Sequence, residues 1–174
     1  MRFAMPRGDK LRYRAGAVPF RIVLVEPEIP PNTGAIARTC VATRTPLHLV
    51  GPLGFDISDH AVRRAGLDYW PKLDLHRHDD FEAFHAAFPD ARPVLFTANA
   101  SRSYLEAELA PGDALVFGRE SVGLPAELVA RYGGVAIPTA GDVRSLNLSN
   151  AVAIALYEGL RRSGVLGETF VETI

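Results

Sequence analysis

Short apolar runs separated by longer amphipathic segments constrain the fold of this chain more than any other feature. The first run, Ile22–Val25, is rich in β-branched residues and lacks polar alternation, so it predicts a strand buried on both faces. Similar runs predict strands at Leu47–Val50, around Leu73–Leu75, and at Val94–Thr97, Ala114–Phe117 and Val135–Ile137. Helices are predicted at Thr33–Thr43, Asp79–Phe88, Pro125–Tyr132 and Leu148–Ser163. This alternation indicates an α/β fold with a mainly parallel sheet flanked by helices.

Composition divides the chain into three parts. Residues 1–20 hold five basic residues against one acidic residue and show no apolar period, which predicts a mobile basic N-terminal arm that either contacts a polyanion or is a solvated leader. Residues 21–164 are expected to form a single domain, because a chain of 174 residues with 48% apolar residues can bury a sufficient core. Residues 165–174 are expected to form a C-terminal tail.

Cysteine content and the length of the apolar runs both argue against secretion and membrane insertion. Cys40 is the single cysteine of the sequence, so it cannot form an internal disulfide. Apolar runs such as Ala151–Leu156 are much shorter than the roughly 20 residues that span a bilayer, and the first twenty residues lack the apolar centre of a signal peptide. We therefore expect a cytoplasmic protein that makes no membrane contact.

Several common catalytic and binding patterns are missing. There is neither a Gly-x-Gly-x-x-Gly after a strand nor the Gly-Lys pair of a P-loop, and Gly118–Gly123 resembles a nucleophile elbow only with its serine one place late. His76, His78 and His85 lie in and beside an acidic stretch expected to be exposed, without a further ligand at a metal spacing, so we expect no metal site. A net charge of −1 restricts any RNA contact to a local patch.

Three segments rich in Gly, Pro and Asn follow predicted strands, where an open parallel sheet binds its ligand. In Pro30–Arg38 a helix start can receive a phosphate, and Gly34 lies one turn before Arg38 on the same face. Phe117–Pro125 predicts either a loop whose backbone closely approaches a ligand or an ordinary strand-to-helix turn. Ser145–Asn150 offers four polar side chains where a helix cap uses one or two.

The helix predicted at Leu148–Ser163 is apolar almost all round. A single face against the sheet cannot bury all of its apolar side chains. The helix is therefore either central to the monomer or packed with its second face on a partner subunit.

In this order and spacing, the segments resemble the SPOUT class of RNA 2′-O-methyltransferases, over about Arg21–Arg162. The likeness is closer still to the branch of that class that methylates the wobble nucleotide of tRNA, of cytidine or uridine type. It rests on Glu26–Arg38, Arg63–Tyr69, Phe117–Pro125 and Arg144–Asn150. The resemblance implies S-adenosylmethionine as cofactor, S-adenosylhomocysteine as product, no metal, a tRNA substrate, a homodimer with composite active sites, and a C-terminal part threaded into a deep trefoil knot.

The resemblance also implies roles for individual residues. Cofactor contacts are expected at Phe96, Gly118, Ile137 and Ser145, with Leu124 and Leu146 as neighbours. The polar catalytic positions are Asn32, Arg38, Glu120, Ser145 and Asn147, and the expected RNA contacts are Arg38, Arg63, Arg64 and Arg144. Because arginine is a poor base, we expect Arg38 to act as an electrostatic clamp on the substrate phosphate and the developing alkoxide, and the proton to pass to that phosphate or to a perturbed Arg38.

Three alternatives remain open on the sequence alone. The enzyme could methylate another tRNA or rRNA site, or the chain could be a non-catalytic module that binds RNA or nucleotides. A flavodoxin-like binding domain would instead bind its cofactor as a monomer.

Overall fold

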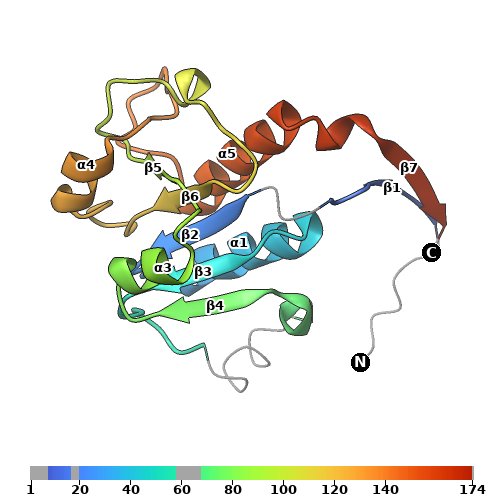
Figure 1. The fold of residues 1–174 in the computed structure, drawn as a ribbon, viewed down its shortest axis with the longest axis horizontal. Helices are drawn as coiled ribbons and strands as arrows, with labels where there is room; N and C mark the ends of the chain where they lie inside the picture. The colour runs from blue at the N-terminus through green and yellow to red at the C-terminus, as the bar shows by residue number, and fades with distance from the viewer. Residues whose placement is uncertain (1–7, 17–19, 58–67, 174) are drawn as a thin grey trace.

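A five-stranded parallel sheet forms the centre of the computed structural model, which describes residues 8–16, 20–57 and 68–173 (Figure 1). The strand order is β4-β3-β2-β6-β5, and every neighbouring pair is parallel. The strands are β2 (Arg21–Val25), β3 (Leu47–Val50), β4 (Leu75–His78), β5 (Pro93–Phe96) and β6 (Ala114–Phe117). The prediction of an α/β fold with a mainly parallel sheet is therefore confirmed.

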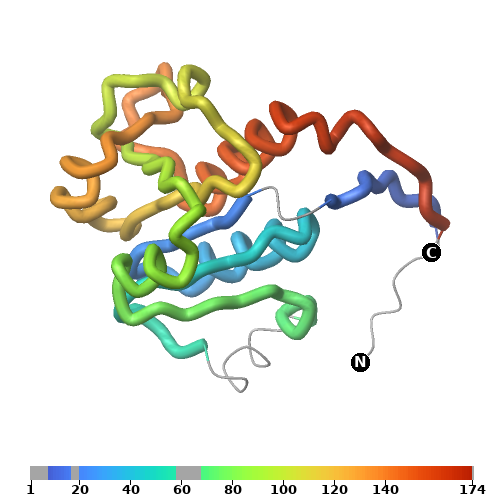
Figure 2. The backbone as a smooth tube through the Cα atoms, viewed as in Figure 1, coloured from blue at the N-terminus to red at the C-terminus, as the bar shows by residue number. Residues whose placement is uncertain are grey.

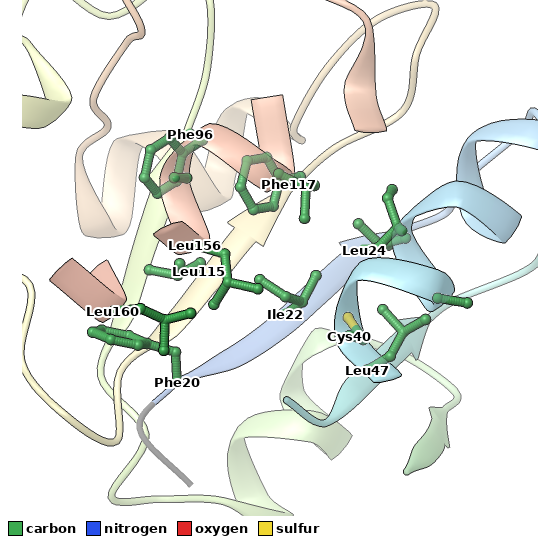
Figure 3. Packing of buried hydrophobic residues seen from close by; sticks show 14 of the residues in the cluster. Phe20, Ile22, Leu24, Cys40, Leu47, Phe96, Leu115, Phe117, Leu156 and Leu160 are labelled. Carbon is green, nitrogen blue, oxygen red and sulfur yellow. The ribbon is translucent and has the colours of Figure 1, made fainter. Parts of the chain in front are cut away.

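Helices cover both faces of this sheet. Alternate residues of β2 enter two separate apolar clusters. Ile22 and Leu24 pack with the helices at Pro30–Thr43 and Leu148–Arg162 (Figure 3), while Val23 and Val25 pack with those at Phe81–Ala87 and Ala126–Tyr132. This double burial explains why the strand reads as a continuous apolar run. The helices are α1 (Pro30–Thr43), α3 (Phe81–Ala87), α4 (Ala126–Tyr132) and α5 (Leu148–Arg162), and short 3₁₀ turns occur at η1 (Trp70–Lys72), η2 (Tyr104–Glu106) and η3 (Val165–Gly167).

The predicted strand at Val135–Ile137 is wrong. Val135 exchanges hydrogen bonds with Leu95 and Thr97 at the end of β5, whereas Ala136 pairs beside Ser103, so each residue forms only an isolated bridge. Two different neighbours on successive residues cannot make a continuous ladder. The strand predicted around Leu73–Leu75 also begins later, at Leu75, because η1 occupies Trp70–Lys72 and the chain needs the next two residues to leave that turn.

A two-stranded antiparallel ribbon joins the two ends of the chain. Strand β1 (Asp9–Tyr13) pairs with β7 (Thr169–Thr173), with Leu11 opposite Val171 and an ion pair of 2.9 Å between Arg12 and Glu172. Figure 2 shows this ribbon beyond the end of α5, away from the sheet. Asp9–Tyr13 belong to the expected mobile arm and Thr169–Thr173 to the expected C-terminal tail, and each of these segments forms a strand because it finds its partner at the other end of the sequence. Residues 1–7 and 17–19 lie outside the described ranges.

The last helix is central to the monomer, as the first of its two interpretations held. Val152, Leu156 and Leu160 on α5 are fully buried in the core, whereas Ile154 is 38% and Tyr157 47% exposed. The helix is thus central to the monomer and still presents apolar side chains outward. Across residues 8–16, 20–57 and 68–173, no helix is both long and apolar enough to cross a membrane.

Candidate active site

A cavity of about 610 Å³ opens where β5 and β6 end, between the starts of α1 and α5. This is the carboxyl edge of the parallel sheet, where α/β proteins bind their ligands. The chain brings most of the expected site residues together here. Those that line the cavity are Asn32, Phe96, Gly118, Glu120, Ile137, Arg144, Ser145, Leu146 and Asn147.

A polar network joins three segments that are far apart in the sequence. The Glu120 carboxylate accepts hydrogen bonds from the backbone N–H groups of Glu28 and Ile29, at 2.9 and 3.2 Å, and from the Asn32 amide at 3.1 Å. The side-chain oxygen Oδ1 of Asn32 in turn accepts a hydrogen bond of 2.9 Å from the side-chain amide of Asn147. Glu120 and Asn147 therefore tie the loop after β6 and the start of α5 to the start of α1.

Each helix start in this network has a local cause. Ile29, the N-cap residue of α1, makes no side-chain cap, and Pro30 and Pro31 have no N–H to satisfy. The negative charge that favours a helix start comes instead from Glu120, in the loop after β6. Asn147 caps α5 by accepting from the N–H groups of Ser149 and Asn150. The Glu120 carboxylate therefore lies at the start of α1, where the sequence predicted that a phosphate could bind.

Gly118 allows the loop after β6 to double back tightly. Arg119 and Gly123 exchange backbone hydrogen bonds of 3.1 and 2.9 Å, and Gly123 adopts a positive φ of 78°. A Cβ atom on Gly118 would overlap the backbone of Gly123 and Leu124. The loop thus presents its backbone to the cavity, while the half-buried Leu124 side chain packs against the cluster on the other face of the sheet and does not line the cavity.

Arg38 does not line the cavity. It is exposed on α1 beyond Asn32, and its guanidinium lies 5.8 Å from the centre of the Tyr69 ring. The Tyr69 hydroxyl donates a hydrogen bond of 2.7 Å to the Gly34 carbonyl, and burial raises the pKa of that hydroxyl. Arg63 and Arg64 lie outside the described residues.

Sequence reasoning missed two acidic residues that hold the loop after β6. The Glu28 carboxylate accepts from the backbone N–H of Ser121 at 3.0 Å, and Glu26 forms an ion pair with Arg119. Arg144 reaches the same loop and donates to the Ser121 carbonyl at 3.1 Å. The signal was present: a Glu-Pro-Glu directly after the central strand places two carboxylates at the ligand-binding edge.

The expectation that His76 and His78 are exposed is wrong, because both half-buried rings stack on His48. The His48 ring is fully buried, with ring centres 4.6 and 5.3 Å from those of His76 and His78, and edges of Phe84 and Phe88 cover the stack. Neighbouring parallel strands bring the three imidazoles to one face of the sheet. Among the described residues, no group of three or more His, Cys, Asp or Glu could hold a metal ion.

Residues 19–157 match the sequence profile of the SpoU rRNA Methylase family. The chain belongs to this family. It is 47% identical over 153 residues, covering 85% of this chain and 98% of the relative, to the tRNA (cytidine(34)-2'-O)-methyltransferase of Burkholderia cenocepacia (strain HI2424).

Solved structures of SpoU-type proteins share the fold. A structure described as giving insights into the 2-OH methylation of C/U34 on tRNA is 51% identical, with a TM-score of 0.77 over 82% of this chain and 95% of that chain. The AdoMet-bound rRNA methyltransferase of Sinorhizobium meliloti is 28% identical, with a TM-score of 0.69 over 87% of this chain and 61% of that one.

The cavity of this SpoU-family chain fits AdoMet, S-adenosylmethionine, which joins an adenosine to an amino acid through a charged sulfonium. A volume of about 610 Å³ suits a ligand of that size. Phe96, Ile137 and Leu146 provide an apolar wall, and the loop at Gly118 adds backbone hydrogen-bonding groups at close range. The size and the lining of the cavity therefore both suit AdoMet.

Proposed function

We propose that this SpoU-family protein transfers the methyl group of S-adenosylmethionine to the ribose 2′-hydroxyl of nucleotide 34, the wobble nucleotide of a tRNA, of cytidine or uridine type. One observation carries the proposal: three distant segments converge on one cavity of cofactor size in a chain that is 51% identical to the protein studied for C/U34 methylation. The likeness extends over 98% of the length of the Burkholderia relative, which favours the same substrate class.

The chain's own task in this reaction is to bind and align. S-adenosylmethionine supplies an already activated methyl group, so catalysis depends mainly on presenting the ribose oxygen in line with it and on excluding water. We assign the cofactor contacts to Phe96, Gly118, Ile137, Ser145 and Leu146, which line the cavity. Leu124 would act from behind, by fixing the backbone of the loop that Gly118 begins.

Glu120, Asn32 and Asn147 hold this arrangement together in the proposed mechanism. Their hydrogen bonds fix the loop after β6 and both helix starts relative to one another. A rigid wall costs no reorganisation when the ribose arrives. These three residues therefore orient the cavity, and Ser145, whose side chain is exposed at its mouth, is positioned to meet the substrate or cofactor.

Arg38 is the proposed clamp on the RNA. Its planar guanidinium can bind a phosphate and the developing alkoxide together through two N–H groups. The exposed position of Arg38, outside the cavity of a single chain, suits a residue that meets the RNA and not the cofactor. The proton of the 2′-hydroxyl then passes to the substrate phosphate or to a perturbed Arg38. Arg63, Arg64 and Arg144 are the further proposed RNA contacts.

We further propose a homodimer, in which the exposed Ile154 and Tyr157 of α5 pack on a second copy. Side chains of this size at 38% and 47% exposure on one helix favour a partner surface. The family resemblance implies composite active sites in such a dimer. We place the catalytic domain at residues 21–164 and the enzyme in the cytoplasm, where tRNA is modified.

We also propose the trefoil knot for the segment between β6 and α5. Its support is the return of residues 135–136 beside β5 and the 102–104 turn, after a loop that doubles back tightly at Gly118. Such a threaded loop would fix the cavity walls without a disulfide.

The decisive experiment is methyl transfer from labelled S-adenosylmethionine to unmodified tRNA, followed by mapping of the modified nucleotide. We expect one 2′-O-methyl group at nucleotide 34, and none on tRNA that carries a 2′-deoxy nucleotide there. Methylation at another nucleotide would overturn the substrate assignment. Cofactor binding without any transfer would instead favour a non-catalytic binding module.

Arg38→Ala should reduce the single-turnover rate by about a hundredfold or more at unchanged S-adenosylmethionine affinity, because the lost contact belongs to the transition state. Arg38→Lys should restore little of that rate, since a point charge cannot replace a two-pronged contact. A rate close to that of the parent protein would remove Arg38 from the mechanism.

A further inference from the structure

Tyr69 and Arg38 meet on the outer side of α1. The Tyr69 ring is half-buried against the core cluster, and the exposed guanidinium of Arg38 lies 5.8 Å from its centre. This separation is within the range in which an aromatic face attracts a cation. Tyr69 is therefore an aromatic neighbour of the exposed Arg38 side chain.

The hydroxyl of the same tyrosine binds the helical turn that carries Arg38. Tyr69 donates a hydrogen bond of 2.7 Å to the carbonyl of Gly34. In an α-helix that carbonyl also accepts the N–H of the residue four positions later, which here is Arg38. Ring and hydroxyl thus act on the side chain and on the backbone of one turn.

The platform itself is held in place by the chain that follows. Tyr69 is the N-cap residue of η1, and its carbonyl accepts from the N–H of Lys72 at 2.9 Å. Trp70 and Leu73 pack on the core cluster from this turn. Because the ring is held in place, it restricts the conformations that the neighbouring Arg38 guanidinium can adopt.

We propose that Tyr69 is a positioning residue that holds the Arg38 guanidinium in the orientation needed for methyl transfer. This inference rests on the proposed function, in which Arg38 clamps the substrate phosphate and the 2′-oxygen. A free arginine samples many rotamers, and most of them point the charge away from the RNA. A ring on one side and an anchored helical turn remove many of those rotamers before the substrate binds, which is preorganisation.

The test is a double-mutant cycle on the single-turnover rate of methyl transfer to tRNA, with S-adenosylmethionine saturating. Tyr69→Leu removes ring and hydroxyl and should lower the rate about tenfold, with cofactor affinity unchanged. Tyr69→Phe keeps the ring and loses the anchor, and should lower the rate about threefold. Both effects should vanish in an Arg38→Ala background, because a positioning residue has nothing left to position.

Tyr132→Phe is the matched control. It removes a buried hydroxyl that has no hydrogen-bond partner among the described residues and that lies in the cluster on the other face of the sheet, so the rate should stay within about twofold. If Tyr69→Leu does not fold, Tyr69→Phe decides the question by the same cycle.

The outcomes separate the two claims. If Arg38→Ala slows transfer but the Tyr69 substitutions slow it equally in both backgrounds, Tyr69 is only structural and this inference is wrong. If the Tyr69 substitutions leave the rate unchanged, it is also wrong. If Arg38→Ala itself has no effect on the rate, the proposed role of Arg38 is wrong, and the inference about Tyr69 is wrong with it.

Discussion

Replacing Glu120 by glutamine tests whether the polar network holds the cavity together. The substitution keeps the size of the side chain but turns one acceptor oxygen into an NH₂ group, which faces backbone donors. Oε1 accepts from Ile29 and Asn32, while Oε2 accepts from Glu28. A glutamine that keeps the two bonds of Oε1 loses the third and leaves the N–H of Glu28 opposite another donor.

The size of the loss follows from these three bonds. A hydrogen bond to a charged group contributes about 1.5–3 kcal/mol and a neutral one about 0.5–1.5 kcal/mol. Losing one charged bond and neutralising the other two, at a half-buried position, should lower the free energy of unfolding by about 2–4 kcal/mol. The loosened loop should also lower S-adenosylmethionine affinity by at least tenfold, since it carries part of the cavity wall.

Urea titration at neutral pH measures the first effect and calorimetric titration of the cofactor the second. Glu82→Gln is the matched control, because it makes the same change at an exposed carboxylate that forms an ion pair with Arg131 at 2.6 Å, where the loss should stay below about 1 kcal/mol. If Glu120→Gln is no more destabilising than Glu82→Gln and binds the cofactor normally, the network does not hold the site.

Three further predictions follow from burial, packing and exposure. Burial, then the neighbouring imidazoles, lower the pKa of His48 to about 3 from 6.5, so below pH 6.5 the unfolded chain binds a proton that the native protein does not. Stability should therefore fall by up to about 1.4 kcal/mol per pH unit between these values, and urea titrations of His48→Leu should show a weaker acid slope. Gly118→Ala should weaken cofactor binding at least tenfold in calorimetry, because its Cβ meets backbone, whereas Gly167→Ala, with open space around it, should bind normally. Light scattering should give about twice 18.9 kDa for the protein and a monomer for Ile154→Glu; a parent monomer with full activity would refute the interface.

The sequence by itself determined the elements that are buried on both sides or punctuated at their ends. β3 and β6 lie where the apolar runs placed them, and β2 begins only one residue earlier, at Arg21, because strands covered on both faces are almost continuously apolar. Helix α5 begins at Leu148 after the cap residue Asn147, as its polar start indicated. The segments that carry the family resemblance could also be located from the sequence, because glycine, proline and asparagine favour particular local backbone conformations.

Only the tertiary structure decided which groups meet across the fold. The partner of β1 is β7, at the other end of the sequence, and neither strand has an apolar period from which the pairing could be predicted. Glu120 holds the start of α1 from a loop about ninety residues away, in the place where local reasoning put a phosphate. Arg38 similarly gains its ring neighbour Tyr69 through packing and not through spacing. Local backbone preferences are written residue by residue, whereas hydrogen bonds and ring contacts between distant segments exist only after the sheet has brought those segments together.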